Sequence, residues 1–363
     1  MKIVVFGLTI SSSWGNGHAT LWRGLCRALA RHGHRVVFFE RDVPYYAMNR
    51  DLFAVPGGEL ILYSEWAEIR AKAQDEITDA DASIVTSYCP DGVAATELVS
   101  GATRAVRVFY DLDSPVTLSR LSRGERVAYL GVRGLADFDL VLSFTGGAAL
   151  DELQHRLGAR TVMPLYGHVD PEVHRRVASV AHYHADLSYL GTHSVDRQAA
   201  LSELLIEPAR RCPQHRFLIG GAQYPQDFPW APNIFFVRHL PPSEHRAFFS
   251  SSRLTLNVTR EPMARMGWCP SGRLFEAAAC GTAILSDTWE GLETFFLPGE
   301  EIFATRGSDD VIAALDLDEA EIKRVGEAAR ERTLSEHTSE RRSFELVAAL
   351  EKARSAQPQL AGA

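Results

Sequence analysis

Short apolar runs alternate with amphipathic stretches along almost the whole chain, and this alternation restricts the fold more than any other feature. The runs at residues 3–8, 35–39 and 106–110 are rich in Val, Ile and Phe without a polar side chain at every second position. Such runs are typical of strands buried on both faces of a parallel sheet. The stretch at residues 16–33 between two runs has leucines at helical spacing. The pattern therefore predicts an α/β fold built from doubly wound parallel sheets.

The same plan occurs twice, which predicts two domains within the 363 residues. We expect one Rossmann-like domain at residues 1–165 and a second at residues 186–333, facing each other across a cleft. Residues 166–185 contain a Gly, a Pro and several His, and are typical of a connector. Residues 334–354 predict a final helix, and residues 355–363 predict a flexible polar tail.

Composition limits which partners and which cellular compartment we expect. The formal net charge is −8 and no long basic run occurs, so a nucleic-acid partner is not expected. The five cysteines are scattered and form no Cys-x-x-Cys pair, which disfavours a disulfide framework or a structural zinc site. No apolar stretch approaches the length needed to span a membrane. We expect a reduced, cytoplasmic protein without a transmembrane segment.

Residues 270–287 read as a loop, a short helix, a tight turn and a buried strand. Ser271 is a good N-cap, and it places Gly272 and Arg273 in the first helical turn. Free backbone N–H groups and the helix dipole favour an anion there. Glu276 is the single acid of this small, apolar helix, where its carboxylate could accept hydrogen bonds from two sugar hydroxyls. The segment therefore predicts a site for a phosphorylated sugar, although an ordinary surface Glu on an α/β helix fits the same pattern.

Further basic and acidic residues follow predicted strands of the second half. Arg260 and Arg265 precede the helix that carries Arg273, and guanidinium groups bind phosphate in a bidentate manner. We select Arg260 and Arg273 as diphosphate ligands. Arg238 ends another predicted strand, where it could belong to a loop that reads a nucleobase, and Asp287 ends the strand after the helix.

Two loops of the first half could carry chemistry. The loop at residues 9–18 is rich in small residues, so that the backbone around Gly17 could approach a ligand closely. His18 lies in the first turn of the following helix, where the dipole favours a neutral imidazole that can act as a base. Asp111 and Asp113 follow another strand, and Asp111 could accept a hydrogen bond from an acceptor hydroxyl or orient His18.

Taken together, these residues resemble the two-domain glycosyltransferases of the GT-B architecture, and most closely the CgeB-like branch related to the group 1 enzymes. The likeness rests on Asn-Val-Thr-Arg at 257–260, Pro-Ser-Gly-Arg-Leu-Phe-Glu-Ala-Ala-Ala-Cys-Gly-Thr at 270–282 and Leu-Ser-Asp at 285–287. In the first half it rests on a strand, Gly-Asn-Gly-His at 15–18 and a helix.

The resemblance implies a role for each half of the chain. The C-terminal domain would hold a nucleotide sugar, with Glu276 on the ribose and with Arg260, Ser271 and Arg273 at the diphosphate. The N-terminal domain would bind the acceptor with the help of His18, and the last helix would cross back onto that domain. One departure is Trp268, which stands eight positions before Glu276, where group 1 enzymes usually carry a Glu that contacts the donor sugar.

The sequence thus predicts an enzyme that transfers a sugar from a nucleoside-diphosphate sugar to an acceptor hydroxyl without a metal or another cofactor. Asp111 and Asp113 invite a metal interpretation, but that use is associated with a different glycosyltransferase architecture. His182 and His184 lack an evident third ligand. Retaining and inverting outcomes both remain open. The alternatives are a nucleotide-sugar epimerase of the same architecture and a non-catalytic nucleotide-sugar-binding protein that assists assembly of a surface or spore layer.

Overall fold

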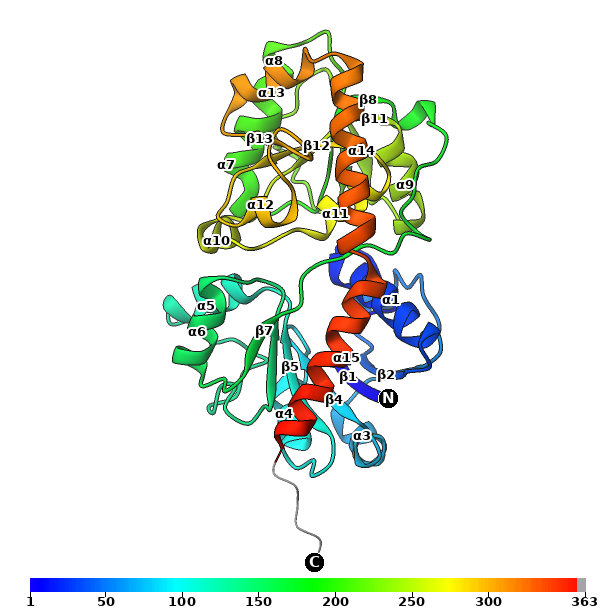
Figure 1. Cartoon of the computed structure of the whole chain (residues 1–363), viewed down its shortest axis with the longest axis vertical. Helices are drawn as coiled ribbons and strands as arrows, with labels where there is room; N and C mark the ends of the chain where they lie inside the picture. Colours follow the sequence, from blue (N-terminus) through cyan, green and yellow to red (C-terminus); the bar gives the residue numbers. More distant parts are fainter. Residues whose placement is uncertain (358–363) are drawn as a thin grey trace, which may run out of the picture. The chain divides into compact units, whose positions relative to one another are not determined.

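The chain forms two compact units (Figure 1). The computed structural model describes residues 1–357. Unit 1 consists of residues 1–13 and 18–166 together with the chain from residue 339 onward, and unit 2 consists of residues 14–17 and 167–338. Each of these units is built on a parallel sheet, which confirms the predicted fold of two doubly wound α/β domains.

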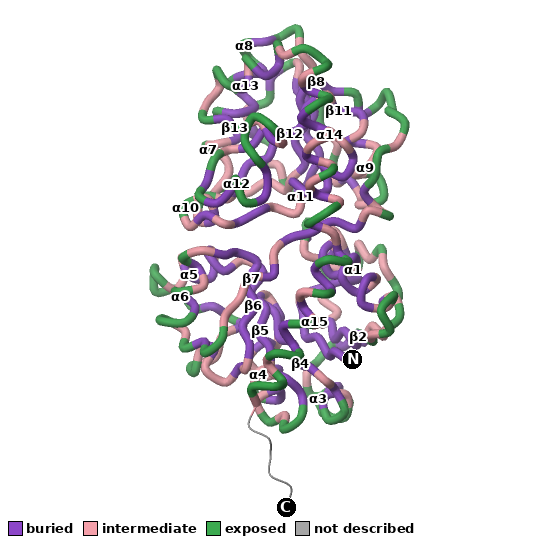
Figure 2. Tube along the Cα trace, viewed as in Figure 1, coloured by how far each residue is buried: buried purple, intermediate pink, exposed green. Residues whose placement is uncertain are grey.

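Unit 1 contains a sheet in which every paired neighbour is parallel. Within residues 1–357 it has seven strands in the order β3-β2-β1-β4-β5-β6-β7. Its central strands are buried over almost their whole length, as the purple segments of Figure 2 show, because helices cover both faces of such a sheet. The strands are β1 (Lys2–Gly7), β2 (Arg35–Arg41), β3 (Glu59–Tyr63), β4 (Ala82–Thr86), β5 (Val106–Asp111), β6 (Leu140–Ser143) and β7 (Val162–Pro164).

Helices from both ends of the chain belong to unit 1. They are α1 (Gly17–Arg31), α2 (Pro44–Ala47), α3 (Trp66–Thr78), α4 (Gly92–Ser100), α5 (Ser114–Ser122), α6 (Ala148–Leu157) and α15 (Ser339–Ala356). The last of these packs near β5, and its Arg354 forms an ion pair with Asp81. The buried guanidinium of Arg342 donates a hydrogen bond from Nε to the carbonyl of Tyr166, at 3.2 Å. The C-terminal helix is therefore held to unit 1 at several points along its length.

Unit 2 repeats the parallel plan. Its sheet has six strands among the described residues, in the order β10-β9-β8-β11-β12-β13. Its core joins large apolar side chains of the sheet, such as Tyr189 and Phe217, to those of the covering helices. The strands are β8 (Ala185–Leu190), β9 (Phe217–Gly221), β10 (Ile234–Arg238), β11 (Ser252–Asn257), β12 (Ala283–Asp287) and β13 (Phe303–Thr305).

The helices of unit 2 include one interruption. A π-helical turn, η3 (Ser202–Ile206), separates the two α-helical parts of residues 198–211. Pro208 follows this turn and cannot donate a backbone hydrogen bond, so a wider turn there avoids its clash with the preceding carbonyl. The helices are η1 (Ala181–Tyr183), η2 (Val195–Arg197), α7 (Gln198–Leu201), α8 (Glu207–Arg211), α9 (Pro242–Ser250), α10 (Glu261–Met266), α11 (Gly272–Ala279), α12 (Leu292–Phe295), α13 (Ser308–Leu315) and α14 (Glu319–Glu336).

Each sheet has one place where the strand order reverses. In unit 1 this switch point lies between β1 and β4, and in unit 2 it lies between β8 and β11. The connections from two such strands leave toward opposite faces of the sheet, which opens a crevice at their carboxyl ends. Ligands of doubly wound sheets bind there, so we expect binding sites at the loops after these four strands.

The predicted flexible tail at residues 355–363 begins inside α15, which ends at Ala356, and the part from residue 358 onward lies outside the described residues. Up to residue 357, none of the helices combines the length and the apolar character needed to cross a membrane.

Candidate nucleotide-sugar site

A short helix begins beside the switch point of unit 2. The predicted N-cap is confirmed, because Ser271 Oγ accepts a hydrogen bond from the backbone N–H of Arg273 at the start of α11. The first turn contains no acid. Its remaining N–H groups and the helix dipole therefore favour a negatively charged ligand.

Arg273 joins the two strands of this switch point. Its guanidinium donates from Nε to the carbonyl of Leu190, the last residue of β8, and from Nη1 to Oδ1 of Asn257, the last residue of β11, at 2.9 Å. The ring of Tyr189 lies below it, with its centroid 5.0 Å from the guanidinium carbon. These contacts fix a positive charge at the carboxyl ends of the central strands.

A second guanidinium, which sequence reasoning missed, lies near Arg273. Arg197 ends η2 and donates a hydrogen bond to the carbonyl of Thr192 in the loop after β8, at 3.2 Å. Enclosure by the protein lowers the pKa of Arg273, and the like charge of Arg197 lowers it further. Arg273 stays protonated, because a guanidinium holds its proton far above neutral pH. An anion between Arg197 and Arg273 would relieve this repulsion.

The other two arginines of the predicted cluster are already paired. Arg260 Nε donates to Oδ2 of Asp196 at 2.8 Å. Burial alone would raise the pKa of Asp196, but hydrogen bonds from Ser194 and Arg260 hold it below its usual value. Arg265 lies on the exposed side of α10 in an ion pair with Glu261. Arg273 is therefore the arginine of the three that reaches the ends of β8 and β11.

Asp287 and Arg238 differ in their surroundings. Asp287 ends β12, and its Oδ1 accepts hydrogen bonds from the backbone N–H and Oγ1 of Thr259, at 3.1 and 2.9 Å. Burial raises the pKa of Asp287. Its contacts fix the loop that follows β11. Arg238 ends β10, an edge strand, and its side chain is exposed.

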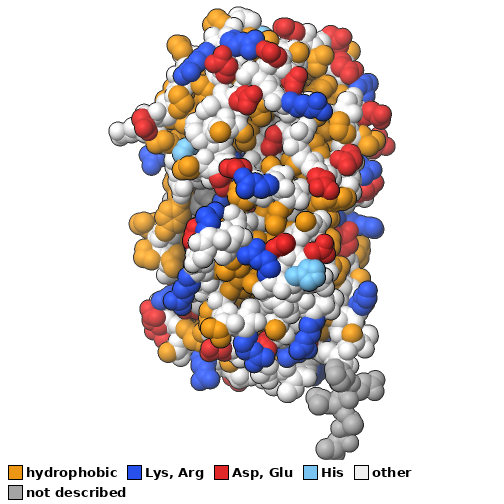
Figure 3. All heavy atoms as spheres, turned by 90° about the vertical axis from the view of Figure 1, so that its left-hand side faces the viewer, with side chains coloured by type: hydrophobic (Ala, Val, Ile, Leu, Met, Phe, Trp, Pro, Cys, Tyr) orange, Lys and Arg blue, Asp and Glu red, His pale blue; other side chains and the backbone are white. Residues whose placement is uncertain are grey.

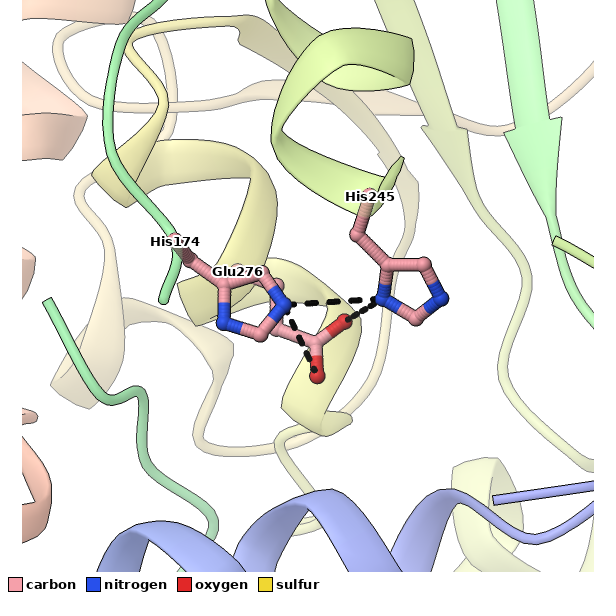
Figure 4. Close-up of side chains that lie close together, drawn as sticks. All are labelled: His174, His245 and Glu276. Atoms are coloured by element: carbon pink, nitrogen blue, oxygen red, sulfur yellow. Dashed lines mark hydrogen bonds and ion pairs between the residues drawn. The ribbon is translucent and has the colours of Figure 1, made fainter. Parts of the chain in front are cut away.

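Glu276 lies on α11 about one turn after Arg273 and faces two histidines (Figure 4). Its carboxylate is 3.4 Å from Nδ1 of His245 and 3.8 Å from Nε2 of His174. Burial alone would raise the pKa of Glu276, but His174, His245 and Arg273 together lower it to about 2. The acid is therefore ionised at neutral pH, inside a small polar cluster that sequence reasoning did not find.

Trp268 occupies a strained position in the loop before α11. Its φ of 49° lies in the left-handed region, which a bulky side chain rarely adopts. Its backbone N–H donates to the carbonyl of Glu290 at 2.6 Å, and its indole packs against Gly291 so closely that a side chain there would collide with it. This loop is therefore held to the segment after β12.

In unit 1 a buried acid organises the loop after β1. Glu40, near the end of β2, accepts hydrogen bonds from the side chain of Thr9, from the backbone N–H groups of Ile10 and Ser11, and from the hydroxyl of Ser11. The four distances lie between 2.5 and 3.0 Å. The carboxylate thus satisfies the loop that leads to Gly17 and His18. Gly17 begins α1 in open space, so packing does not require a glycine there.

His18 faces Asp113 rather than Asp111. Its Nε2 lies 4.0 Å from Oδ2 of Asp113, and its ring stacks on Tyr88 with centroids 5.9 Å apart. Tyr88 donates its hydroxyl hydrogen bond to the same Asp113 oxygen, at 2.8 Å. These three residues come from the loops after β1, β4 and β5, so they meet at the carboxyl end of the sheet.

Asp111 is buried below this group. Its Oδ1 accepts hydrogen bonds from the backbone N–H of Asp113 and from Oγ1 of Thr117, at 3.1 and 3.2 Å. Burial raises its pKa to about 6. The expectation that Asp111 orients His18 therefore needs correction, because Asp111 holds the loop that presents Asp113, and Asp113 is the acid beside the imidazole.

Replacing Glu40 by Gln should destabilise unit 1 strongly. The amide would place a donor where the carboxylate now accepts from buried groups, so backbone or side-chain donors of the loop lose their partner. We expect the free energy of unfolding to fall by about 2–4 kcal/mol in urea denaturation. The control is Glu59→Gln, which removes exposed ion pairs with Arg35 and Lys72 and should cost less than about 1 kcal/mol. Equal losses in the two variants would contradict the role of Glu40.

Asp111→Asn should change the pH dependence of stability. The pKa of about 6 in the folded protein exceeds the value of about 3.9 in an unfolded chain. The folded state therefore keeps a proton that the unfolded state loses, and Asp111 reduces stability progressively as the pH rises from about 4 to about 6. Because Asn does not titrate, the stability of the variant relative to the parent should increase by about 2 kcal/mol between pH 4 and pH 7.

Asp139→Asn provides a control of opposite sign in the same unit. Burial alone would raise the pKa of Asp139, but hydrogen bonds from Arg107 outweigh this and lower it. The Asp139 carboxylate thus stabilises the fold above its unfolded pKa, and this contribution is lost as the pH falls through the folded pKa. Because most of this change lies below pH 4, urea denaturation at both pH values should show no gain in the relative stability of the Asp139→Asn variant from pH 4 to pH 7. The same sign in both variants would contradict the assignment for Asp111.

Comparisons with known proteins agree with this geometry. Residues 197–348 match a family described as "Glycosyl transferase-like", which is less than half of the chain. The match confirms the predicted glycosyltransferase character of the C-terminal part. No curated protein matches the chain significantly.

Several solved structures share the fold over nearly the whole chain, each at 15% sequence identity. Sucrose-phosphate synthase from Thermosynechococcus elongatus aligns with a TM-score of 0.74, covering 98% of this chain and 100% of its own. HepE of Anabaena, solved with UDP and glucose, aligns with a TM-score of 0.65 over 97% and 100% of the two chains. An α-glucosyltransferase solved with UDP aligns with a TM-score of 0.70 over 97% and 100%.

Sequence identity of 15% shows a common fold and does not show common substrates. Residues 197–348 therefore match the glycosyl transferase-like family, and the chain as a whole has the two-domain GT-B fold of these glycosyltransferases.

Proposed function

We propose that the chain transfers a sugar from a nucleoside-diphosphate sugar to an acceptor hydroxyl, without a metal ion in the transfer step. The observation that carries the proposal is Arg273, whose guanidinium contacts the ends of β8 and β11 beside the start of α11. Strand ends at a switch point, a helix N-terminus and a fixed guanidinium together suit a diphosphate. The structures of HepE and of the α-glucosyltransferase contain UDP, which supports a uridine nucleotide as the first candidate.

In this proposal the donor binds to unit 2. The first-turn N–H groups at Gly272 and Arg273 and the side chain of Ser271 lie at the diphosphate, where Arg197 and Arg260 add positive charge. Glu276 accepts hydrogen bonds from the ribose hydroxyls.

Three further residues support donor binding in the same proposal. Asp287 orients the loop after β11, Arg238 belongs to the nucleobase side and Gly17 to the loop that approaches the donor. Placement in the CgeB-like branch remains a part of the proposal, supported by the motifs at 257–260 and 270–282.

The transfer step follows from these charges. The acceptor oxygen forms a bond to the anomeric carbon, the bond from that carbon to the diphosphate oxygen breaks, and the nucleoside diphosphate leaves with the electron pair. Arg273 and the α11 N-terminus stabilise the developing negative charge, which is an electrostatic task. His18 accepts the proton of the acceptor hydroxyl, and Asp113 stabilises the resulting imidazolium. Asp111 supports this pair from below.

The acceptor is proposed to be something other than a nucleic acid. One neighbouring α-glucosyltransferase was solved with DNA, but this chain carries a net charge of −8. On the face drawn in Figure 3, basic and acidic side chains are interspersed and form no continuous basic stripe. Such a surface would not attract a phosphate backbone. A cytoplasmic location, expected from the cysteines, stays a prediction.

Binding of UDP and UDP-glucose should depend on Arg273. In a thermal-shift titration with a panel of nucleoside diphosphates and nucleotide sugars, a uridine nucleotide should raise the melting temperature by mass action. Arg273→Gln removes a charge-assisted contact, so the affinity should fall roughly tenfold or more. Arg265→Gln is the matched control, because it also removes one arginine near α11 but one that is exposed and paired with Glu261. A melting temperature unmoved by every nucleotide would defeat the proposal.

His18→Asn should separate chemistry from donor binding. Loss of the proton acceptor should lower the transfer rate by roughly 10²-fold or more, while the UDP-induced thermal shift stays close to that of the parent. The rate is measured as UDP released in the presence of acceptor candidates. His34→Asn, at a histidine that contacts the N-terminal amine of Met1, serves as the control and should keep the parental rate. Unchanged release from the His18 variant would exclude it as the base.

A further inference from the structure

His174, His245 and Glu276 form a three-residue cluster inside unit 2 (Figure 4). His174 belongs to the segment before β8, His245 to α9 and Glu276 to α11. The side chains point toward one another from three elements that are distant in the sequence, and one ligand atom from each lies within 4.8 Å of the others.

The separations in this cluster do not suit hydrogen bonds. His174 Nε2 lies 3.5 Å from His245 Nδ1 and 3.8 Å from Glu276 Oε1, and His245 Nδ1 lies 3.4 Å from Glu276 Oε2. Hydrogen bonds between nitrogen and oxygen are usually about 2.7–3.2 Å long. Two ligands bound tetrahedrally at about 2.0–2.1 Å lie roughly 3.3–3.4 Å apart. These separations are thus closer to those of a metal site. The two carboxylate distances end on different oxygens of Glu276, and with a single atom from each residue all three atoms lie within 4.8 Å of one another.

His174 has poor alternatives to a ligand in this position. His174 is 1% exposed. Within the described part of the chain, its Nδ1 has no hydrogen-bond partner, and its Nε2 has only the long approaches to His245, at 3.5 Å, and to Glu276, at 3.8 Å. A buried polar group without a good partner is costly, about 1–3 kcal/mol. A cation between the three side chains would satisfy Nε2.

His245 is oriented so that one of its ring nitrogens faces the cluster. His245 Nε2 lies 3.3 Å from the carbonyl of Leu240, to which it can donate a hydrogen bond. With the proton on Nε2, the lone pair of Nδ1 points toward Glu276 and His174. A ring nitrogen fixed in this way by a backbone carbonyl is the usual arrangement of metal-bound histidines.

We propose that Nε2 of His174, Nδ1 of His245 and one carboxylate oxygen of Glu276 bind one divalent transition-metal ion. Two imidazoles and a carboxylate favour Zn²⁺ over Mg²⁺ or Ca²⁺, which prefer oxygen ligands. Three protein ligands leave a fourth position for water or a hydroxyl. This inference goes beyond the proposed transfer, in which the ion takes no step. A single carboxylate oxygen on the metal leaves the other for the ribose contact proposed for Glu276.

The test is a Co²⁺ titration of the chelator-treated, tag-free full chain in the absence of nucleotide. Co²⁺ replaces Zn²⁺ in such sites and gives visible absorption that reports a low coordination number. One equivalent of Co²⁺ should produce these bands, and Zn²⁺ should abolish them. A folded protein that gives no bands would overturn the proposal and would leave the proposed function untouched, because no nucleotide is involved.

Variants localise the ion. His245→Gln and His174→Gln should each weaken Co²⁺ binding about 100-fold or more, with folding checked by circular dichroism. The matched control is His182→Gln combined with His184→Gln, which removes an exposed histidine pair of the same unit and should leave binding unchanged. Retained binding in a folded His245→Gln variant, or loss of binding in the control, would overturn the assignment. If a variant fails to fold, the titration of the parent protein decides.

Discussion

The positive charge at the switch point of unit 2 is the constraint on which the candidate site depends. The carbonyl of Leu190 and the side-chain oxygen of Asn257 lie at the carboxyl ends of β8 and β11, where without a cation they would repel an anionic ligand. Arg273 changes this surface by donating to Leu190 and Asn257 from within the first turn of α11. The same guanidinium thus links the ends of two neighbouring strands and favours anionic ligands in the crevice.

In unit 1 a buried negative charge, rather than a positive one, orders the loop beside the switch point. Its loop after β1 is rich in hydroxyl and backbone donors, and the buried carboxylate of Glu40 accepts four hydrogen bonds from them. The loop is thereby ordered without a ligand. His18, Tyr88 and Asp113 meet above it from three loops. The two units therefore use one fold for different tasks, with fixed donors in unit 2 and a titratable pair in unit 1.

The sequence predicted what depends on local pattern. The two parallel sheets follow from continuous apolar runs, and the start of α11 follows from Ser271, because capping involves neighbouring residues only. The sequence did not predict roles that depend on contacts between residues distant in the chain. Glu40 looks like the polar end of an apolar run until the loop after β1 folds onto it. His174 and His245 are 71 residues apart, and their spacing carries no signal. Asp111 and Asp113 could not be told apart, because only burial distinguishes them.

The division of the chain into units has a consequence for how the protein is made. Unit 1 includes the segment from residue 339 onward, whereas nearly all of unit 2 lies within residues 167–338. During synthesis every residue of unit 2 is added to the chain before α15. The surface of unit 1 that contacts Arg342 and Arg354 therefore stays exposed until α15 has been synthesised. Loss of α15 would therefore remove contacts from the unit that was synthesised first.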